Sequence, residues 1–179
     1  MRTIPLLLLL LLSACSSQPD ISYYQLPAVV AGNAGENAKP LYIEPVQVAG
    51  YLNGRGLVLQ VSDVELVTAR QHLWAEALDQ QLQRQLRDLL ALEAAGFSPV
   101  LQAGADTPRL TVQLARFHGQ PDGYAVIGGR FAISSQPGSQ AFTLRVPLAN
   151  DGYPALVTAL AEGLQQLSTM ISLQLQQAG

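Results

Sequence analysis

A run of leucines ahead of the only cysteine constrains this chain more than any other feature. Residues 6–12 are seven consecutive leucines, Arg2 places a positive charge before them, and small residues stand immediately before Cys15. A charged start, a short apolar run and small residues before a cleavage point are the three parts of a secretory signal. The run is too short to span a bilayer, which needs roughly 20 apolar residues. We therefore expect residues 1–14 to be a signal peptide.

The end of this signal, Leu-Ser-Ala-Cys at residues 12–15, resembles a bacterial lipobox. The resemblance implies cleavage before Cys15, a diacylglycerol thioether on its sulfur and a fatty acyl group on its new amino terminus. Three chains of about 15 methylenes at ~0.8 kcal/mol each would make membrane association effectively permanent. Ser16 stands where an aspartate would resemble the inner-membrane retention signal, so we expect an outer-membrane anchor facing the periplasm. The alternative is a plain secretory peptide with an incidental cysteine.

Composition excludes several classes of function. Removing residues 1–14 leaves 165, which is enough for one domain with a core and too few for two comfortable ones. The formal net charge of −3 argues against nucleic-acid binding, which depends on neutralising phosphates with Lys and Arg. Lys39 is the only lysine, so no polybasic patch is present. Acylation of Cys15 leaves no thiol for a disulfide, and stability must come from packing.

The segment between the anchor and the domain combines a short tether with a β-prone stretch. We expect residues 15–40 to carry the lipidated cysteine and the tether, and residues 41–179 to form a single domain. Tyr23 and Tyr24 lie in the tether. They could dock on the domain and hold it against the membrane, or serve as interfacial anchors at the lipid head groups.

The first half of the domain predicts strands followed by a helix. Residues 41–48 alternate as a strand that Pro45 pushes toward an edge or a bulge, Asn53-Gly54 favours a tight hairpin, and residues 57–61 return, with 64–67 as an extension or third strand. These strands predict a β-meander. An amphipathic helix follows to about Leu92, because one apolar stripe recurs near every fourth position: Trp74, Leu78, Leu82, Leu86 and Leu90. We expect it to begin at about His72, although the capping-box spacing of Thr68 and Gln71 would also allow a start at Ala69.

The second half repeats this order. After a short strand at 97–101, residues 109–117, 124–133 and 141–148 predict three antiparallel strands, with Gly128-Gly129 marking a bulge or a close backbone approach. Asp151 and Pro154 open a last helix whose apolar face continues to about residue 175. We therefore expect an α+β fold, an antiparallel sheet of five to seven strands with two amphipathic helices packed on one face.

No arrangement of residues predicts catalysis or metal binding. His72 and His118 are the only histidines, and neither has a metal-ligand spacing. We expect no catalytic residues, no metal and no cofactor other than the lipid on Cys15. Tyr51, Leu52 and Trp74 are candidate partner contacts, because large apolar side chains beside an exposed turn, and a lone tryptophan, suit binding. Each could instead serve packing. The uncharged flank of the last helix could support a homo-oligomer.

Several short pieces taken together resemble the ABC-type transport auxiliary lipoprotein component family, the PqiC or YmbA type. In chain order these pieces are Cys15 followed by Tyr23-Tyr24-x-Leu26, Pro45-Val46 through Tyr51-Leu52, Trp74-Ala75-Glu76-Ala77-Leu78, Leu110-Thr111-Val112 through Arg116-Phe117, and Leu164-x-x-Leu167-Ser168-x-x-Ile171. They span nearly all of the mature chain.

The resemblance implies a periplasm-facing, non-catalytic accessory subunit of an MCE-type intermembrane lipid transport system that contributes to envelope integrity. Its partner would be an MCE-domain transport protein. Two other functions stay open: a lipoprotein that itself binds a lipid or a glycan, and a structural lipoprotein that assembles with an outer-membrane protein.

Overall fold

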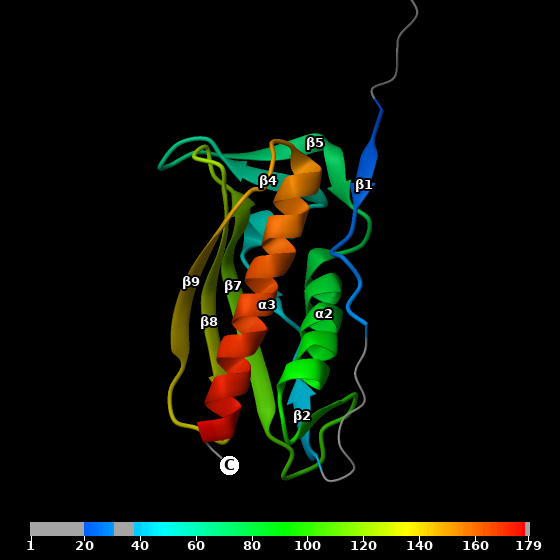
Figure 1. Ribbon diagram of the computed structural model, residues 1–179, viewed down its shortest axis with the longest axis vertical. Coiled ribbons are helices and arrows are strands. Elements are labelled where there is room, and N and C mark those ends of the chain that lie inside the picture. Colours follow the sequence, from blue (N-terminus) through cyan, green and yellow to red (C-terminus); the bar gives the residue numbers. More distant parts are fainter. Residues whose placement is uncertain (1–19, 31–37, 178–179) are drawn as a thin grey trace, which may run out of the picture.

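A computed structural model describes residues 20–30 and 38–177 (Figure 1). The elements follow the order β1 (Ser22–Tyr24), β2 (Lys39–Ile43), β3 (Gln47–Val48), a 3-10 helix (Gly50–Leu52), β4 (Gly56–Gln60), β5 (Leu66–Trp74), α2 (Leu78–Glu93), β6 (Phe97–Val100), β7 (Arg109–Gly119), β8 (Tyr124–Ile133), β9 (Gln140–Pro147) and α3 (Tyr153–Gln177). The strands form one sheet, and the expected α+β class is confirmed.

The sheet has nine strands within the described residues and is mixed, whereas we expected five to seven antiparallel strands. Its main path runs β1-β5-β4-β7-β2-β6, and β8 and β9 extend it from β7. The pairs β4–β5, β7–β8 and β8–β9 are antiparallel, while β1, β2, β3 and β4 each have a parallel neighbour. The long antiparallel strands are thus the part of the sheet that the sequence predicted.

The expected meander is wrong. β2 and β3 both pair in parallel with β7, and neither pairs with β4. Pro45 lies between β2 and β3, where its missing N–H interrupts the strand. Asn53-Gly54, which lies between β3 and β4, therefore does not close a hairpin between these two strands. The antiparallel partner of β4 is β5, reached through residues 61–65.

The first helix begins at Leu78, later than the expected start at about His72. Trp74 is the last residue of β5, and its backbone N–H donates to the carbonyl oxygen of Arg55 at 2.6 Å. The rest of the predicted stripe is correct, because Leu78, Leu82, Leu86 and Leu90 are all buried. The coincidence of a tryptophan four residues before this stripe explains the error.

Both helices cover the same face of the sheet, as predicted (Figure 1). α3 lies across β8 and β9 and packs beside α2, which covers β2 and β6. Gly163 brings α3 against Ile127 of β8, where a Cβ atom would collide with the isoleucine side chain. The core therefore lies between this helical layer and the inner face of the sheet. No helix in residues 20–30 or 38–177 has both the length and the apolarity needed to cross a membrane.

The strands β7, β8 and β9 agree closely with the prediction, including the irregularity at the paired glycines. The β7–β8 register shifts between Leu114 and Arg116, so Ala115 is the extra residue of a bulge. Gly129 lies opposite Leu114, and a Cβ atom there would collide with the carbonyl oxygen of Gln113. A bulge and a close backbone approach are both present.

Candidate functional site

The segment that follows the predicted anchor joins the domain through β1. Cys15 lies outside the described residues, so its acylation stays a prediction. β1 pairs in parallel with the last three residues of β5, with Ser22 opposite His72 and Tyr24 opposite Trp74. The hydroxyl of Tyr24 lies 3.0 Å from Nδ1 of His72, and the His72 ring stacks on Tyr153 of α3 with ring centroids 3.9 Å apart. β1 is thus bound to both the sheet and α3.

The next residues are bound to α2. The backbone N–H of Leu26 donates to Oε1 of Gln81, and Nε2 of Gln85 donates to the carbonyl oxygen of Pro27 at 2.9 Å. Both glutamines are buried, and these bonds to main chain satisfy polar atoms that burial would otherwise leave unpaired. Leu26 is itself part of the core. We call these contacts of residues 22–27 the N-terminal clamp.

The N-terminal clamp fixes how far the domain can lie from Cys15. Seven residue steps separate Cys15 from Ser22. A fully extended chain spans at most ~3.6 Å per residue, so the two Cα atoms lie at most about 25 Å apart. The point where the chain enters the sheet is therefore held close to any anchor on Cys15.

The three candidate partner contacts lie in different settings. Leu52 and Trp74 are 2% and 3% exposed and belong to the core, where the Trp74 ring packs 6.1 Å from Phe117 between centroids. Tyr51 retains some surface, and its hydroxyl donates to the carbonyl oxygen of Ala115 at 2.8 Å. Burial raises the pKa of this hydroxyl above its ordinary value, and nearby Arg116 opposes the rise. The structure does not bring these three residues together on one surface.

The outer face of the sheet, away from the helices, carries four arginines: Arg109, Arg116, Arg130 and Arg145, all exposed. Arg109 and Arg145 form ion pairs with Glu44 and Asp122, respectively. Arg116 donates to the hydroxyl of Thr143 at 2.7 Å, and Arg130 to that of Ser139 at 3.0 Å. This face is therefore polar and well solvated, which distinguishes it from the apolar inner face.

A second surface is apolar, and the sequence analysis did not single it out. The β4–β5 arm, Gly56–Trp74, extends along one end of the molecule (Figure 1). We call residues 61–67 the arm tip. Val64 is 96% exposed there, and Val61, Leu66 and Val67 are 42–44% exposed. Four large apolar side chains within seven residues, interrupted by a turn, were the signal that could have identified this surface.

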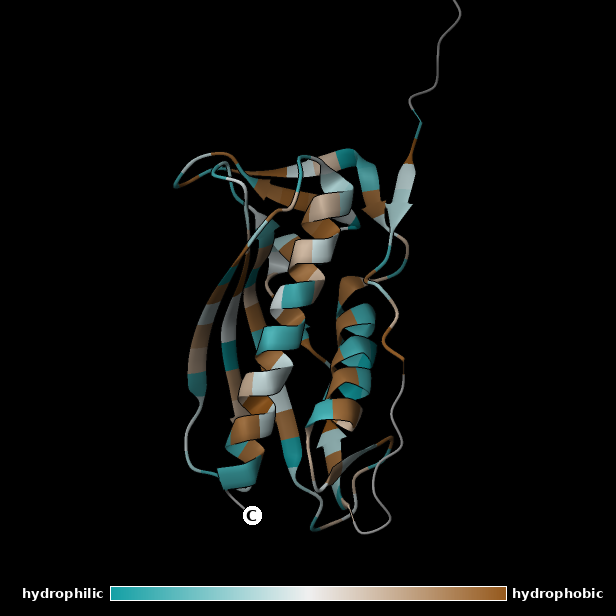
Figure 2. Cartoon of the chain, in the orientation of Figure 1, coloured by the Kyte–Doolittle hydropathy of each residue, from teal (hydrophilic) through white to brown (hydrophobic). Residues whose placement is uncertain are grey.

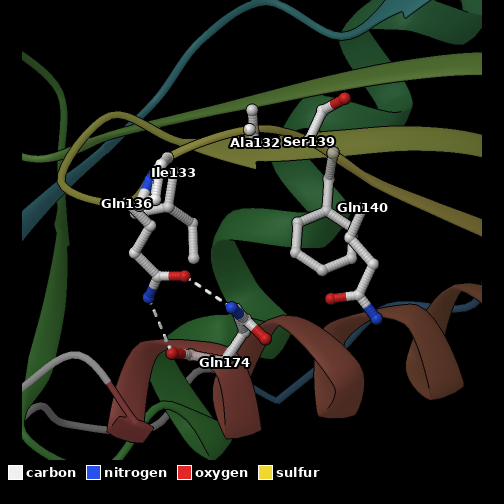
Figure 3. A pocket seen from close by; sticks show the side chains of 9 residues that line it. Ala132, Ile133, Gln136, Ser139, Gln140 and Gln174 are labelled. Carbon is white, nitrogen blue, oxygen red and sulfur yellow. Dashed lines mark hydrogen bonds between the residues drawn. The ribbon is translucent and has the colours of Figure 1, made fainter.

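A small hollow lies between the turn after β8 and the end of α3 (Figure 3). Gln136 and Gln174 bond to each other across it: Nε2 of Gln136 donates to the Gln174 carbonyl oxygen at 2.8 Å, and Nε2 of Gln174 donates to Oε1 of Gln136 at 2.5 Å. Its volume of about 190 Å³ is below the ~300 Å³ at which ligand pockets usually begin. The paired amides fit a contact that fastens α3 to the sheet.

The described residues hold no assembled catalytic or metal site. Residues 20–30 and 38–177 contain no group of three His, Cys, Asp or Glu side chains placed to bind a metal ion. Nδ1 of His118 lies 3.1 Å from the carbonyl oxygen of Gly119, and burial lowers the pKa of its imidazole below the ordinary value. His72 contacts two tyrosine rings. In the described part of the chain, neither ring bonds to a carboxylate that could orient it as a general base.

Two solved structures share the fold. A crystal structure of an uncharacterized protein superposes with a TM-score of 0.78 at 37% identity, covering 87% of this chain and 99% of that one. A crystal structure of a protein from Xanthomonas campestris superposes with a TM-score of 0.66 over 88% of this chain and all of that one. At 18% identity, the second likeness shows the fold alone.

The family model described as ABC-type transport auxiliary lipoprotein component matches residues 24–172. The chain belongs to this family, and the resemblance found in the sequence is confirmed. Among curated relatives, the intermembrane transport lipoproteins PqiC of Escherichia coli (strain K12) and of Shigella flexneri are each 36% identical over 157 residues, which is 84% of both chains. The matched region begins at Tyr24, so it includes residues 24–27 of the N-terminal clamp.

Proposed function

We propose that this protein is a non-catalytic accessory subunit of an MCE-type intermembrane lipid transport system, anchored through acylated Cys15 to the outer membrane and facing the periplasm. Family membership supports a role as an auxiliary transport lipoprotein. The names of the relatives from Escherichia coli and Shigella flexneri support transport between membranes. Through this role the protein contributes to envelope integrity.

The observation that carries the proposal is the N-terminal clamp. Tyr24 binds His72, and the segment around Leu26 binds α2, so the folded domain starts within about 25 Å of the anchoring residue. A long flexible tether would let the domain move through the periplasm. A short, bound one holds it at one membrane and leaves its faces available to a protein that reaches across from the other.

The anchor is tested by fractionating cells that express the full chain, the C15A variant or the S16D variant. We expect the unchanged chain in the outer membrane, because Cys15 is acylated and Ser16 permits release from the inner membrane. C15A should be absent from the outer membrane, and S16D should remain with the inner membrane. A mass for the mature protein without added hydrocarbon would contradict the anchor.

The partner is tested by crosslinking in intact cells followed by affinity capture through this protein. We expect an MCE-domain protein among the captured species. The C15A variant is the matched control, because its described domain is unchanged while its place at the membrane is lost, and capture should fall with it. Capture of an outer-membrane β-barrel without an MCE-domain protein would contradict the proposal and favour a structural role.

A further inference from the structure

Most of the large exposed apolar side chains of the described residues lie at the end of the molecule where β1 enters, at the arm tip on one side and beside β1 on the other (Figure 1). Of ten such side chains, six belong to β1, the residue before it or the arm tip: Ile21, Tyr23, Val61, Val64, Leu66 and Val67. Figure 2 shows apolar segments at this end, on the arm and at the start of β1.

The arm tip is an ordered hairpin with no core behind it. Leu59 pairs with Val67, Gln60 with Leu66, and the Val61 N–H donates to the carbonyl oxygen of Glu65 at 3.0 Å. Successive residues of a strand point to opposite faces, yet Leu66 and Val67 are both exposed. Both faces of the hairpin therefore present apolar side chains to the surroundings, in a fixed arrangement.

The direction of β1 relates this hairpin to the anchor. β1 is parallel to β5 over His72–Trp74, and it enters the sheet at the end of the molecule that the β4–β5 arm crosses (Figure 1). Leu66 lies six residue steps from His72, so their Cα atoms are at most about 20 Å apart. The seven residue steps from Cys15 to Ser22 span at most about 25 Å. A bilayer that holds Cys15 is thus within reach of the arm tip.

The charges of the arm tip indicate which lipids fit. Asp63 and Glu65 flank Val64, and residues 61–67 contain no lysine or arginine. Two carboxylates at the tip suit neutral, zwitterionic head groups and disfavour anionic ones. Tyr23, which is 59% exposed on the neighbouring β1, is of a type enriched at the membrane–water interface.

We infer that the arm tip inserts Val64 and its apolar neighbours into the interfacial layer of the phospholipid bilayer that anchors Cys15, as a second, non-covalent membrane contact. The inference rests on the proposed function only in requiring acylation of Cys15. The anchor retains the protein, and the arm fixes the orientation in which the domain stands on the surface.

The test uses the mature lipidated chain in vesicles of phosphatidylethanolamine and phosphatidylcholine. Acylation occupies the native cysteine, so V64C introduces one free thiol for an environment-sensitive fluorophore. We expect the label to shift to shorter wavelength and to be quenched by spin-labelled lipid. L173C is the matched control, because Leu173 is 55% exposed near the C-terminal end of α3, far along the molecule from the arm (Figure 1). Its label should show neither change.

The outcomes separate the arm from the anchor. Flotation with the vesicles and one label per chain establish the anchor, whereas failure to float together with a second labelled thiol refutes acylation itself. With the anchor present, a V64C label that stays in water overturns the inference. A label that is shielded but not quenched by lipid also overturns it, and points to a second copy or another protein at the arm. Adding anionic lipid should reduce the shift at Val64.

Discussion

The β4–β5 arm and the strands β7, β8 and β9 are both antiparallel, but only the second group has a helix across it. In β7 the inward residues Leu110, Val112 and Leu114 are buried and alternate with more exposed positions, because α3 and α2 cover one face. At the arm tip, Leu66 and Val67 are both exposed. In this protein, buried and exposed residues alternate along a strand only where a helix covers one face of it. The apolar residues of the arm tip are not part of the core.

The largest loss of stability should come from truncating a side chain where α3 covers the sheet. Leu164 is fully buried in α3. We expect L164A to lower the free energy of unfolding by about 3–4 kcal/mol, because the substitution leaves a cavity in a core that can relax only partly. Urea denaturation of the mature chain measures this loss. L173A, in the same helix but at an exposed position, should change it by less than about 0.5 kcal/mol; equal losses would contradict the comparison.

The next effect should come from the bulge. In G129A the added methyl group would collide with the Gln113 carbonyl oxygen, so the backbone of β7 must move, and we expect a loss of about 2–3 kcal/mol. G128A is the control, because a methyl group there meets only the side chain of Arg116, which can turn away. Thermal and urea unfolding of both variants give the comparison. A larger loss for G128A would show that the close approach of the two strands is unimportant.

A smaller, pH-dependent change in the free energy of unfolding is expected at His118, where β7 meets β4 of the arm. His118 lies beside Gly119, the residue through which β7 pairs with Leu59 of β4. Burial lowers the pKa of His118 in the folded state, so as pH falls the unfolded chain binds a proton first. The free energy of unfolding should therefore decrease as pH falls through the ordinary histidine pKa of about 6.5, until the folded state also binds the proton. In H118Q, the free energy of unfolding measured across this pH range should lose the part of its pH dependence that comes from His118. An unchanged pH dependence would contradict the prediction.

The smallest effect on stability is expected at the arm tip. V64S should change the free energy of unfolding in solution by less than about 0.5 kcal/mol, because Val64 is 96% exposed. V112S makes the same substitution at a fully buried position of β7 and should cost far more, since it removes apolar contacts and buries a hydroxyl. If V64S destabilised the protein like V112S, the arm tip would belong to the core after all.

The same contrast explains which parts of the fold could be predicted. β7, β8 and β9 were found nearly to the residue, because helices on one face impose a regular alternation on their sequences. The pair Gly128-Gly129 predicted the bulge. β5 was assigned only in part, since its exposed half lacks that alternation, and Trp74 was placed in the helix because it stands four residues before Leu78.

The surroundings of the candidate contact residues Tyr51 and Leu52 were harder to predict, for a related reason. Tyr51 and Leu52 lie beside Asn53-Gly54, which in isolation favours an exposed hairpin. In the structure the 3-10 helix Gly50–Leu52 turns Leu52 into the core, because β3 pairs with β7 and not with β4. Pairing between strands that are about 65 residues apart leaves no local pattern in the sequence. The contacts of the N-terminal clamp also join residues far apart in the chain, 48–58 positions from each other.

The parallel pairing of β1 with β5 determines how the domain bears a pull on its N-terminal segment. A pull on the N-terminus directed along β1 slides this strand lengthwise against its neighbour, so the bonds at Ser22 and Tyr24 are strained together and not one after another. Behind them, the bonds of Leu26 and Pro27 to α2 take up any remaining force. With Cys15 acylated as proposed, a pull on the domain would load the acyl chains and the strand in series, and the protein would resist as one mechanical unit.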